Sequence, residues 1–499
     1  MSALRKLLGQ AALAWLMALV ALLAPPAFAG PQVFLVQNSG WMEPFYTDPN
    51  SQYKPLIAAL IGAAAAPGDP FVLAAFNQSQ AQLASPRSLL SARAGPATQA
   101  EVMTALGLLT VAKKPGGAMA DTDLGEALGA AMDTALGGKP GLVWLFTNNR
   151  NSPNNDQATA RRNREFYARI HQGGAISKVL AFPLRMPVKG SNYSANGLMV
   201  YVFAVGAEGA RQLDDLLATG RIAKVITERP ARLKPLDRDT VRLVPRRVDN
   251  SAGVAFSLTP QGVLRADIDD AQAPTAKIAW NLENTMYPYT IVSARVVASS
   301  ILADQERPIL LAREHIGGLA PGRAEPLASV MQLPGNDLPS KWSMAAVKAA
   351  GSAFVLPGKI ELQLTEQKLA LSQDFRQRMA TLFPGDPLPD IFTPPDTIKA
   401  STALLPLEVR VVYGMAPLMA LIAAGLAAAV AVGAAALAYG RPRRAMLTVE
   451  GEQRSIRTRA GLTQPIFDQA GQKVAQLKTT LFGNQLIDVR EGAQVRLGR

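Results

Sequence analysis

The chain of 499 residues contains no cysteine and only two histidines, His171 and His315. The lack of cysteine excludes a disulfide framework, a cysteine-based metal site and a thiol nucleophile. Two histidines are too few for a histidine metal cluster, and neither lies in a recognisable catalytic motif. No glycine-rich nucleotide-binding loop occurs either. We therefore expect a protein that is not an enzyme, although paired carboxylates for glycoside chemistry would leave no local signature.

Charged residues are scarce, at 18% of the chain, and the formal net charge is +13. A basic excess suits nucleic acid, an anionic membrane surface or an anionic polymer. Basic patches interleaved with aromatic residues, which are typical of single-strand binders, do not occur. We expect no nucleic-acid partner. Hydrophobic residues make up 48% of the chain, which is enough for large cores and membrane segments.

The first 29 residues have the layout of a bacterial signal peptide. Arg5 and Lys6 form a charged start, residues 11–23 are apolar, and residues 27–29 form a small-x-small cleavage pattern before Gly30. An uncleaved anchor is the alternative, but the apolar run is short and two prolines interrupt it. Export of the segment after residue 29 follows from the first interpretation.

A second apolar segment, residues 415–439, carries no charge and is long enough to span a membrane. Arg441, Arg443 and Arg444 follow it, and positive residues remain on the cytoplasmic side. We expect a single-pass protein of the bacterial inner membrane, with the bulk of the chain in the periplasm and the tail in the cytoplasm. The arginines could contact anionic lipid; a role as a topology marker alone would also explain them.

Short apolar runs alternate with helical patterns over residues 30–220. Residues 33–36 predict a buried strand that ends in a polar loop at residues 37–40. A helix is expected over residues 52–66, and an edge strand over residues 80–84. Strands and helices in alternation predict a doubly wound α/β domain with both faces of the sheet covered. Ligands bind at the carboxyl ends of the strands in such sheets.

Three segments in this region carry a family resemblance. The loop after the first strand, residues 122–128 and residues 142–149 resemble, in order and spacing, the three parts of a metal-ion-dependent adhesion site in von Willebrand factor A (vWA) domains. The resemblance covers about residues 32–220. It implies a vWA-like fold whose strand-end surface binds a protein partner, with Mg²⁺ as the family's ion.

The candidate site departs from that pattern in its charges. Gln37 stands where the family's first aspartate is expected, Trp41 where its second serine is, and Asn148 where its last aspartate is; only Ser39 and Thr122 keep the expected type. Mg²⁺ favours carboxylate oxygens, so the degenerate site predicts metal-independent binding. The open alternative is that nearby carboxylates supply the missing metal ligands; the candidates are Glu43, Asp121 and Asp123. The same three residues could instead be solvated loop carboxylates, or charges favoured by a helix N-terminus.

The remaining chain predicts further regions. Residues 221–240 are basic and interrupted by proline, which is typical of a linker. Residues 241–410 show frequent short strands separated by turn residues, which predicts an antiparallel β-sandwich-like domain, with a short helix over residues 373–383. The tail, residues 445–499, is strand-like and predicts a small β-rich module.

Two functions fit this organisation. The first is a non-catalytic, membrane-anchored, periplasmic protein-binding module that contacts its partner through the five site residues Gln37, Ser39, Trp41, Thr122 and Asn148. The second is a structural or signalling link across the membrane, in which the tail recruits a cytoplasmic partner. Trp41 resembles an interface anchor, but a tryptophan packed on its own domain is equally consistent with the sequence.

Overall fold

The computed structural model describes residues 30–80, 84–150, 157–249, 254–268, 275–333, 338–340, 342–385 and 391–498. The expected signal peptide lies outside these residues. The chain divides into two compact units, of which the first contains the α/β region and most of the β-rich region, and the second contains residues 335–355, an apolar helix and the tail.

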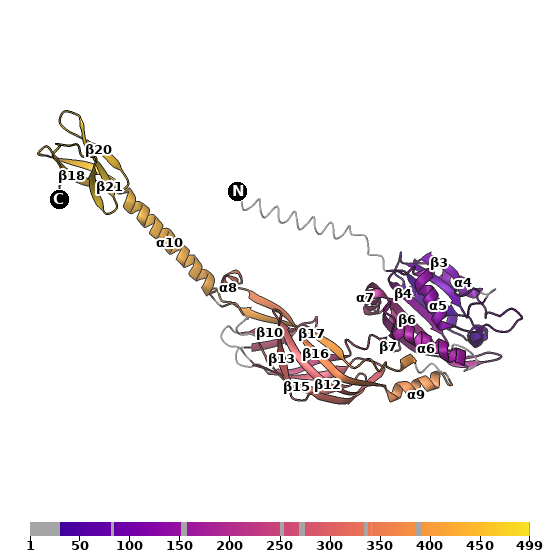
Figure 1. The fold of residues 1–499 in the computed structure, drawn as a ribbon. Coiled ribbons are helices and arrows are strands. Elements are labelled where there is room, and N and C mark those ends of the chain that lie inside the picture. Colours follow the sequence, from indigo (N-terminus) through magenta and orange to yellow (C-terminus); the bar gives the residue numbers. More distant parts are fainter. Residues whose placement is uncertain are drawn as a thin grey trace. The chain divides into compact units, whose positions relative to one another are not determined.

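A seven-stranded mixed sheet organises the α/β region, in the strand order β3-β2-β1-β4-β6-β5-β7 (Figure 1). Strand β1 is internal and pairs in parallel with β2 on one side and with β4 on the other. The predicted α/β class is therefore confirmed. The strands are β1 (Gln32–Gln37), β2 (Pro70–Phe76), β3 (Arg87–Arg93), β4 (Gly141–Thr147), β5 (Ile176–Lys189), β6 (Ser194–Val205) and β7 (Ala231–Lys234).

Both faces of the sheet are buried. Each strand contributes to both cores, because successive side chains of a strand point to opposite faces. Phe34 and Val36 of β1 pack into one core, and Val33 and Leu35 into the other. The first core is covered by α3 (Tyr53–Ala64), α4 (Thr98–Gly107) and α7 (Gly206–Ala218). The second is covered by α5 (Leu124–Ala130), its π-helical continuation η2 (Ala131–Ala135) and α6 (Gln157–His171).

Strands β5 and β6 form an antiparallel hairpin, where the sequence pattern predicted a doubly wound parallel arrangement. Strand β6 pairs antiparallel with both β4 and β5. The connection is only residues 190–193, closed by a 2.8 Å hydrogen bond from the Gly190 amide to the Tyr193 carbonyl. A parallel crossover needs a dozen or more residues, so this short connection permits only a hairpin. The expectation of a doubly wound sheet is wrong for this half.

The edges of the sheet are formed by β3 and β7. The edge beyond β2 is β3, which begins at Arg87. Of the edge strand expected over residues 80–84, residues 81–83 lie outside the described residues. The other edge is β7, which lies inside the expected linker 221–240 and pairs antiparallel with β5. Ala231 and Leu233 of β7 are fully buried in the second core. Their burial makes this segment part of the α/β region and not a bare connection.

The β-rich region forms one path of paired strands, in the order β8-β11-β15-β13-β12-β16-β17-β10-β9, with β14 paired to β12. The described pairings β8–β11, β11–β15, β13–β15, β12–β13, β12–β14 and β12–β16 are antiparallel, as predicted. The strands are β8 (Val241–Asp249), β9 (Val254–Leu258), β10 (Leu264–Ile268), β11 (Thr275–Asn284), β12 (Tyr289–Leu302), β13 (Gln305–Leu311), β14 (His315–Leu319), β15 (Ala324–Gln332), β16 (Ala353–Leu371) and β17 (Ser401–Val412).

Helix α9 (Gln373–Leu382) connects β16 to β17 but packs in the core of the α/β region. Its side chains Phe375, Met379 and Leu382 join Phe166 of α6 and Phe203 of β6 in the second core. The α9 segment thus covers the sheet beside the antiparallel hairpin. Consequently the boundary expected near residue 220 does not separate two independent cores.

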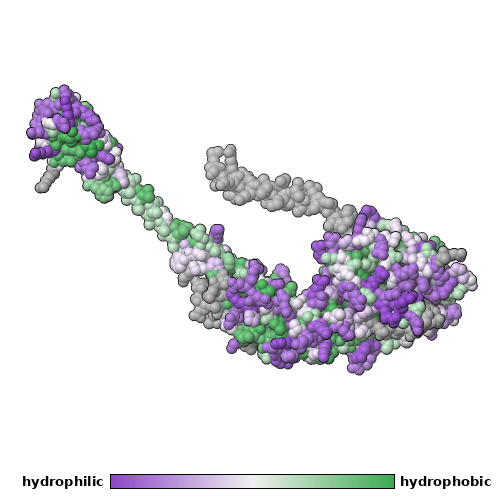
Figure 2. Space-filling model, viewed as in Figure 1, coloured by the Kyte–Doolittle hydropathy of each residue, from purple (hydrophilic) through white to green (hydrophobic). Residues whose placement is uncertain are grey.

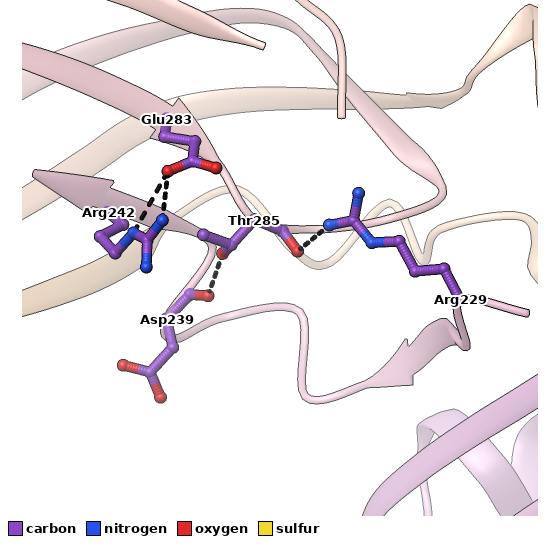
Figure 3. A network of polar contacts seen from close by, with 5 residues as sticks. All are labelled: Arg229, Asp239, Arg242, Glu283 and Thr285. Atoms are coloured by element: carbon purple, nitrogen blue, oxygen red, sulfur yellow. Dashed lines mark hydrogen bonds and ion pairs between the residues drawn. The ribbon is translucent and has the colours of Figure 1, made fainter. Parts of the chain in front are cut away.

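A polar network further ties the segment around β7 to the β-rich region (Figure 3). The Thr285 hydroxyl donates to the Asp239 carbonyl at 2.8 Å, and Arg229 donates to the Thr285 carbonyl at 3.4 Å. Arg242 pairs with Glu283 at 2.6 Å across β8 and β11. These contacts fix the chain where it passes from one sheet to the next.

The second unit contains one helix that is long and apolar enough to cross a membrane, the only such helix among the described residues. This helix, α10 (Ala416–Gly440), has a mean hydropathy of 2.3 over residues 416–437, and none of that window is buried. The tail folds into two three-stranded sheets, β19-β18-β23 and β20-β21-β22. Its strands are β18 (Arg443–Val449), β19 (Glu452–Thr458), β20 (Thr463–Phe467), β21 (Lys473–Thr480), β22 (Gly483–Ile487) and β23 (Val495–Leu497).

Candidate functional site

Three segments that are distant in sequence meet at the carboxyl ends of β1 and β4. Strand β1 ends at Gln37 and β4 ends at Thr147, and the two strands are parallel neighbours with Val36 beside Phe146. The loop before α5 brings Thr122 to the same place, because the Gly40 amide donates to the Ala120 carbonyl at 2.8 Å. The sheet topology therefore assembles the site that the sequence spacing predicted.

The side-chain amide of Gln37 occupies the centre of the site. Its Nε2 donates to Ser39 Oγ at 2.7 Å and to Thr122 Oγ1 at 2.9 Å. Thr122 Oγ1 also donates to Ser39 Oγ at 2.7 Å. The amide nitrogen thus holds the two hydroxyl oxygens together by hydrogen bonding.

Two donors from the end of β4 fix the orientation of that amide. The Gln37 Oε1 accepts from Thr147 Oγ1 at 2.5 Å and from the Asn148 backbone amide at 3.2 Å. Thr147 Oγ1 in turn accepts from the Asn149 amide at 2.9 Å, so its own proton is available for Gln37. Because backbone N–H groups only donate, the oxygen of Gln37 must face β4 and its NH₂ group must face Ser39 and Thr122.

The hydrogen-bonded cluster is closed to solvent. Gln37, Ser39, Thr122 and Thr147 have no exposed surface, and Asn148 is 7% exposed. A buried polar group needs its hydrogen bonds to offset desolvation. In this conformation a partner can reach Gln37, Ser39 and Thr122 only through the residues that cover them.

Two tyrosine hydroxyls hold the main chain of Gln37. Tyr46 and Tyr53 both donate their hydroxyls to the Gln37 backbone carbonyl, at 2.9 and 3.0 Å. Burial raises the pKa of Tyr46 and of Tyr53 well above the ordinary tyrosine range. Both hydroxyls therefore stay protonated and keep donating at any pH at which the protein is folded.

Trp41 lies two residues after Ser39 and is half-buried. Its ring lies 4.5 Å from that of Tyr193, centroid to centroid, and the Arg150 guanidinium lies 4.6 Å from the centre of the indole. The Trp41 carbonyl accepts from Asn148 Nδ2 at 3.0 Å. Among the described residues, the buried indole N–H has no hydrogen-bond partner. Trp41, Arg150 and Tyr193 form what we call the aromatic cover of the site.

Sequence reasoning missed Arg150, Tyr193 and the role of Thr147. Arg150 follows the polar end of β4 directly, so its position is a signal that could have been used. Arg150 also donates to the Pro384 carbonyl at 3.0 Å, which links the cover to the end of α9. Tyr193 comes from the β5–β6 hairpin, and no local pattern in the sequence indicates its place in the site.

The three nearby carboxylates are engaged away from the cluster. Glu43 accepts from the Ser191 amide at 2.7 Å and is 4% exposed. Asp121 pairs with Lys114 at 2.5 Å. Asp123 caps α5, accepting from the Glu126 amide at 2.9 Å. Each carboxylate therefore has a structural partner of its own.

The residues present do not fit the Mg²⁺ implied by the family resemblance. Mg²⁺ requires oxygen ligands in near-octahedral geometry, whereas an NH₂ group points at both hydroxyl oxygens here. Among the described residues, no group of three or more histidine, aspartate or glutamate side chains is placed to hold a metal. The donor set is that of a hydrogen-bonded cluster and not of a cation site.

Comparison with known proteins gives little beyond this geometry. No protein family and no curated protein sequence matches the chain. Among solved structures it is similar to a von Willebrand factor type A protein from Catenulispora acidiphila, with 10% identity over 70% of this chain and 68% of that one, at a TM-score of 0.20. The description of the fold therefore rests on the strand pairings and not on this likeness.

Proposed function

We propose that the chain is a non-catalytic, membrane-anchored protein-binding module whose vWA-like strand-end surface binds a protein partner without a metal ion. The observation that carries this proposal is the Gln37 amide, which makes the contacts to Ser39 and Thr122 that a cation would otherwise make. The site is then complete without charge. The aromatic cover lies above it and offers the contact surface.

The composition of the aromatic cover supports a binding role. Tryptophan, tyrosine and arginine are the residue types enriched at binding hot spots. Within the described part of the chain, the buried indole N–H of Trp41 has no acceptor, and an unsatisfied buried donor costs about 1–3 kcal/mol. A partner that turns the ring and accepts from this N–H would recover that free energy.

The compartment follows from two segments. The signal-peptide layout of residues 1–29 and the arginines after α10 support a periplasmic site, a single-pass anchor in the bacterial inner membrane and a cytoplasmic tail. In this arrangement the site faces envelope proteins.

Photocrosslinking in cells tests the binding role. A photoreactive phenylalanine replaces the exposed Asn192, next to Tyr193, and the control probe replaces the exposed Gln99 of α4. Gln99 is a suitable control because α4 follows β3, and the last residue of β3, Arg93, pairs with Pro70 at the start of β2. The start of β2 is at the end of the sheet opposite the site. We expect one protein to be crosslinked from position 192 and not from position 99.

Two further conditions test the mechanism. Trp41→Ala should remove the crosslink at position 192, whereas chelation of divalent ions should leave it unchanged. A crosslink that disappears with chelator and returns with Mg²⁺ would contradict metal-independent binding. An identical product from positions 99 and 192 would contradict the site.

The folded tail favours a second candidate function, a link across the membrane. The tail has its own core, formed by Ala445, Leu447, Val449, Ile466, Val474, Ala475 and Leu477. If the arginines after α10 served only to fix the topology, the tail would need no folded core. Deletion of residues 445–499 separates the candidates: unchanged crosslinking and unchanged cell phenotype favour the outer binding module, and a lost phenotype with the crosslink retained favours the link.

A further inference from the structure

One end of the tail module carries the most exposed large apolar side chain among the described residues. Phe482, in the β21–β22 turn, is 100% exposed, Leu481 is 39% exposed and Leu462 is 42% exposed. The β19–β20 turn lies beside that of β21–β22, because the Thr479 amide donates to the Leu462 carbonyl at 3.0 Å. We call Leu462, Leu481 and Phe482 the apolar tip.

The apolar tip lies at the end of the module where α10 enters. Helix α10 ends at Gly440, and β18 begins at Arg443. Arg443 donates to the Leu481 carbonyl at 3.4 Å, and its strand partner Thr458 contacts the Thr479 hydroxyl at 2.5 Å. The tip is therefore held within one side-chain length of the segment that leaves the helix.

Charge is distributed unevenly between the two ends of the module. The end with the apolar tip carries exposed arginines, namely Arg441, Arg443, Arg444, Arg457 and Arg459. The acidic residues described in the tail lie toward the opposite end, in the β18–β19 turn, the β20–β21 turn and the segment after β22: Glu450, Glu452, Asp468, Asp488 and Glu491. Figure 2 shows the hydrophilic and hydrophobic parts of this module as separate areas of its surface.

We propose that the tail module docks on the cytoplasmic surface of the membrane, with the apolar tip inserted at the headgroup level and the surrounding arginines on anionic phospholipid. A fully exposed phenylalanine is unfavourable in water but stable at a membrane interface. Arginine beside it is attracted to the negative surface potential of the cytoplasmic leaflet. The inference goes beyond partner binding by the outer site. It rests on the proposed function only in that α10 spans the bilayer and the tail is cytoplasmic.

The length of β21 sets the geometry of the docked module. Its eight residues are separated by seven steps of about 3.3 Å, which place its two ends roughly 23 Å apart. The turn at residues 468–472 therefore lies well outside the headgroup layer when Phe482 is inserted. Gln469 in that turn is exposed and serves as the matched control position.

The full chain can be labelled at single sites because it has no cysteine. Leu462→Cys and Gln469→Cys each take one spin label, and the protein is placed in nanodiscs of phosphatidylcholine alone or with phosphatidylglycerol. Access of each label to a water-soluble nickel chelate and to oxygen, which concentrates in lipid, is measured. A third protein combines Leu462→Cys with Phe482→Ser.

The proposal predicts that the label at 462 is shielded from the chelate and accessible to oxygen, more so with phosphatidylglycerol, whereas the label at 469 is open to the chelate. Phe482→Ser should expose position 462. Equal access at 462 and 469 in protein that co-elutes with nanodiscs would overturn the docking alone. Failure to enter nanodiscs would overturn both the docking and the proposed anchor.

Discussion

Gln37 shows how one side-chain change alters the type of binding that a site can support. An amide group is nearly the same size and shape as a carboxylate. It carries no charge, and it supplies two N–H donors as well as an acceptor. Ser39 and Thr122 accept from the donors, and the end of β4 satisfies the acceptor. The cluster is neutral and buried, so neither an ion nor a proton is needed to balance it.

Removal of the Gln37 amide should destabilise the protein. Gln37→Leu leaves the Thr147 hydroxyl and the Asn148 amide without their acceptor, at about 1–3 kcal/mol for each buried group. Gln32→Leu is the matched control, because Gln32 is also buried in β1 and holds Trp144 Nε1 at 3.0 Å. Thermal unfolding should show a similar loss for both variants, while only Gln37→Leu abolishes the crosslink at position 192.

The loop after β1 should tolerate no side chain at Gly40. A Cβ built there would lie 2.5 Å from Met119 Cβ, so Gly40→Ala must displace the loop that carries Thr122. Gly62→Ala is the control, because Gly62 lies in α3 with open space around it and alanine favours a helix by up to about 1 kcal/mol. We expect a lower melting temperature for Gly40→Ala and an equal or higher one for Gly62→Ala.

The composition of the site could be predicted from the sequence only in part. Ser39, Thr122 and Asn148 follow strands or precede a helix at a known spacing, so their convergence could be expected. Tyr193 reaches Trp41 through the turn of a hairpin, and Arg150 reaches it through its side-chain conformation. Those contacts depend on tertiary packing, which no local pattern reveals.

At the scale of elements, α9 is the unexpected part of the fold. The expected short helix over residues 373–383 is confirmed as α9, but a helix prediction does not say which sheet the helix covers. Because β5 and β6 are joined by a tight turn, no helix of the local sequence lies between them. Helix α9 packs against both strands instead, although it belongs by sequence to the β-rich region.

Truncation of α9 at its buried face should therefore loosen the α/β sheet. Phe375→Ala removes a side chain that contacts Phe392 at 5.0 Å, centroid to centroid, and should cost about 3–5 kcal/mol. Gln377→Ala, on the exposed face of α9, should cost little. Hydrogen exchange should then show faster exchange of β6 amides in Phe375→Ala. Unchanged β6 protection would argue against a shared core.

The junction of α6 with residues 391–393 should be sensitive to acid. Burial lowers the pKa of His171, a hydrogen bond to the Ile391 carbonyl opposes this shift, and Lys234 lowers the pKa further. Below about pH 6.5, the ordinary value for histidine, the unfolded chain binds the proton more readily than the folded one. Stability should fall with decreasing pH, and His171→Gln should flatten the decline between pH 7 and pH 5. An equally steep decline in the variant would contradict the assignment.

At the scale of the whole molecule, the chain combines an uncharged hydrogen-bonded cluster, a helix that is long and apolar enough to cross a membrane, and a folded tail. Helix α10 was predictable because apolar length alone identifies it. The division into independent domains was not, because α9 and β7 cross the expected boundaries.

The most direct test of the account is a calorimetric titration of the full chain, in nanodiscs, with Mg²⁺ and Mn²⁺. Because the Gln37 amide already donates to the hydroxyl oxygens of Ser39 and Thr122, wild-type protein should show no saturable binding heat. The double variant Gln37→Asp with Asn148→Asp, which restores two carboxylates, should gain it. Micromolar binding by the wild type that Ser39→Ala and Thr122→Ala abolish would contradict the account.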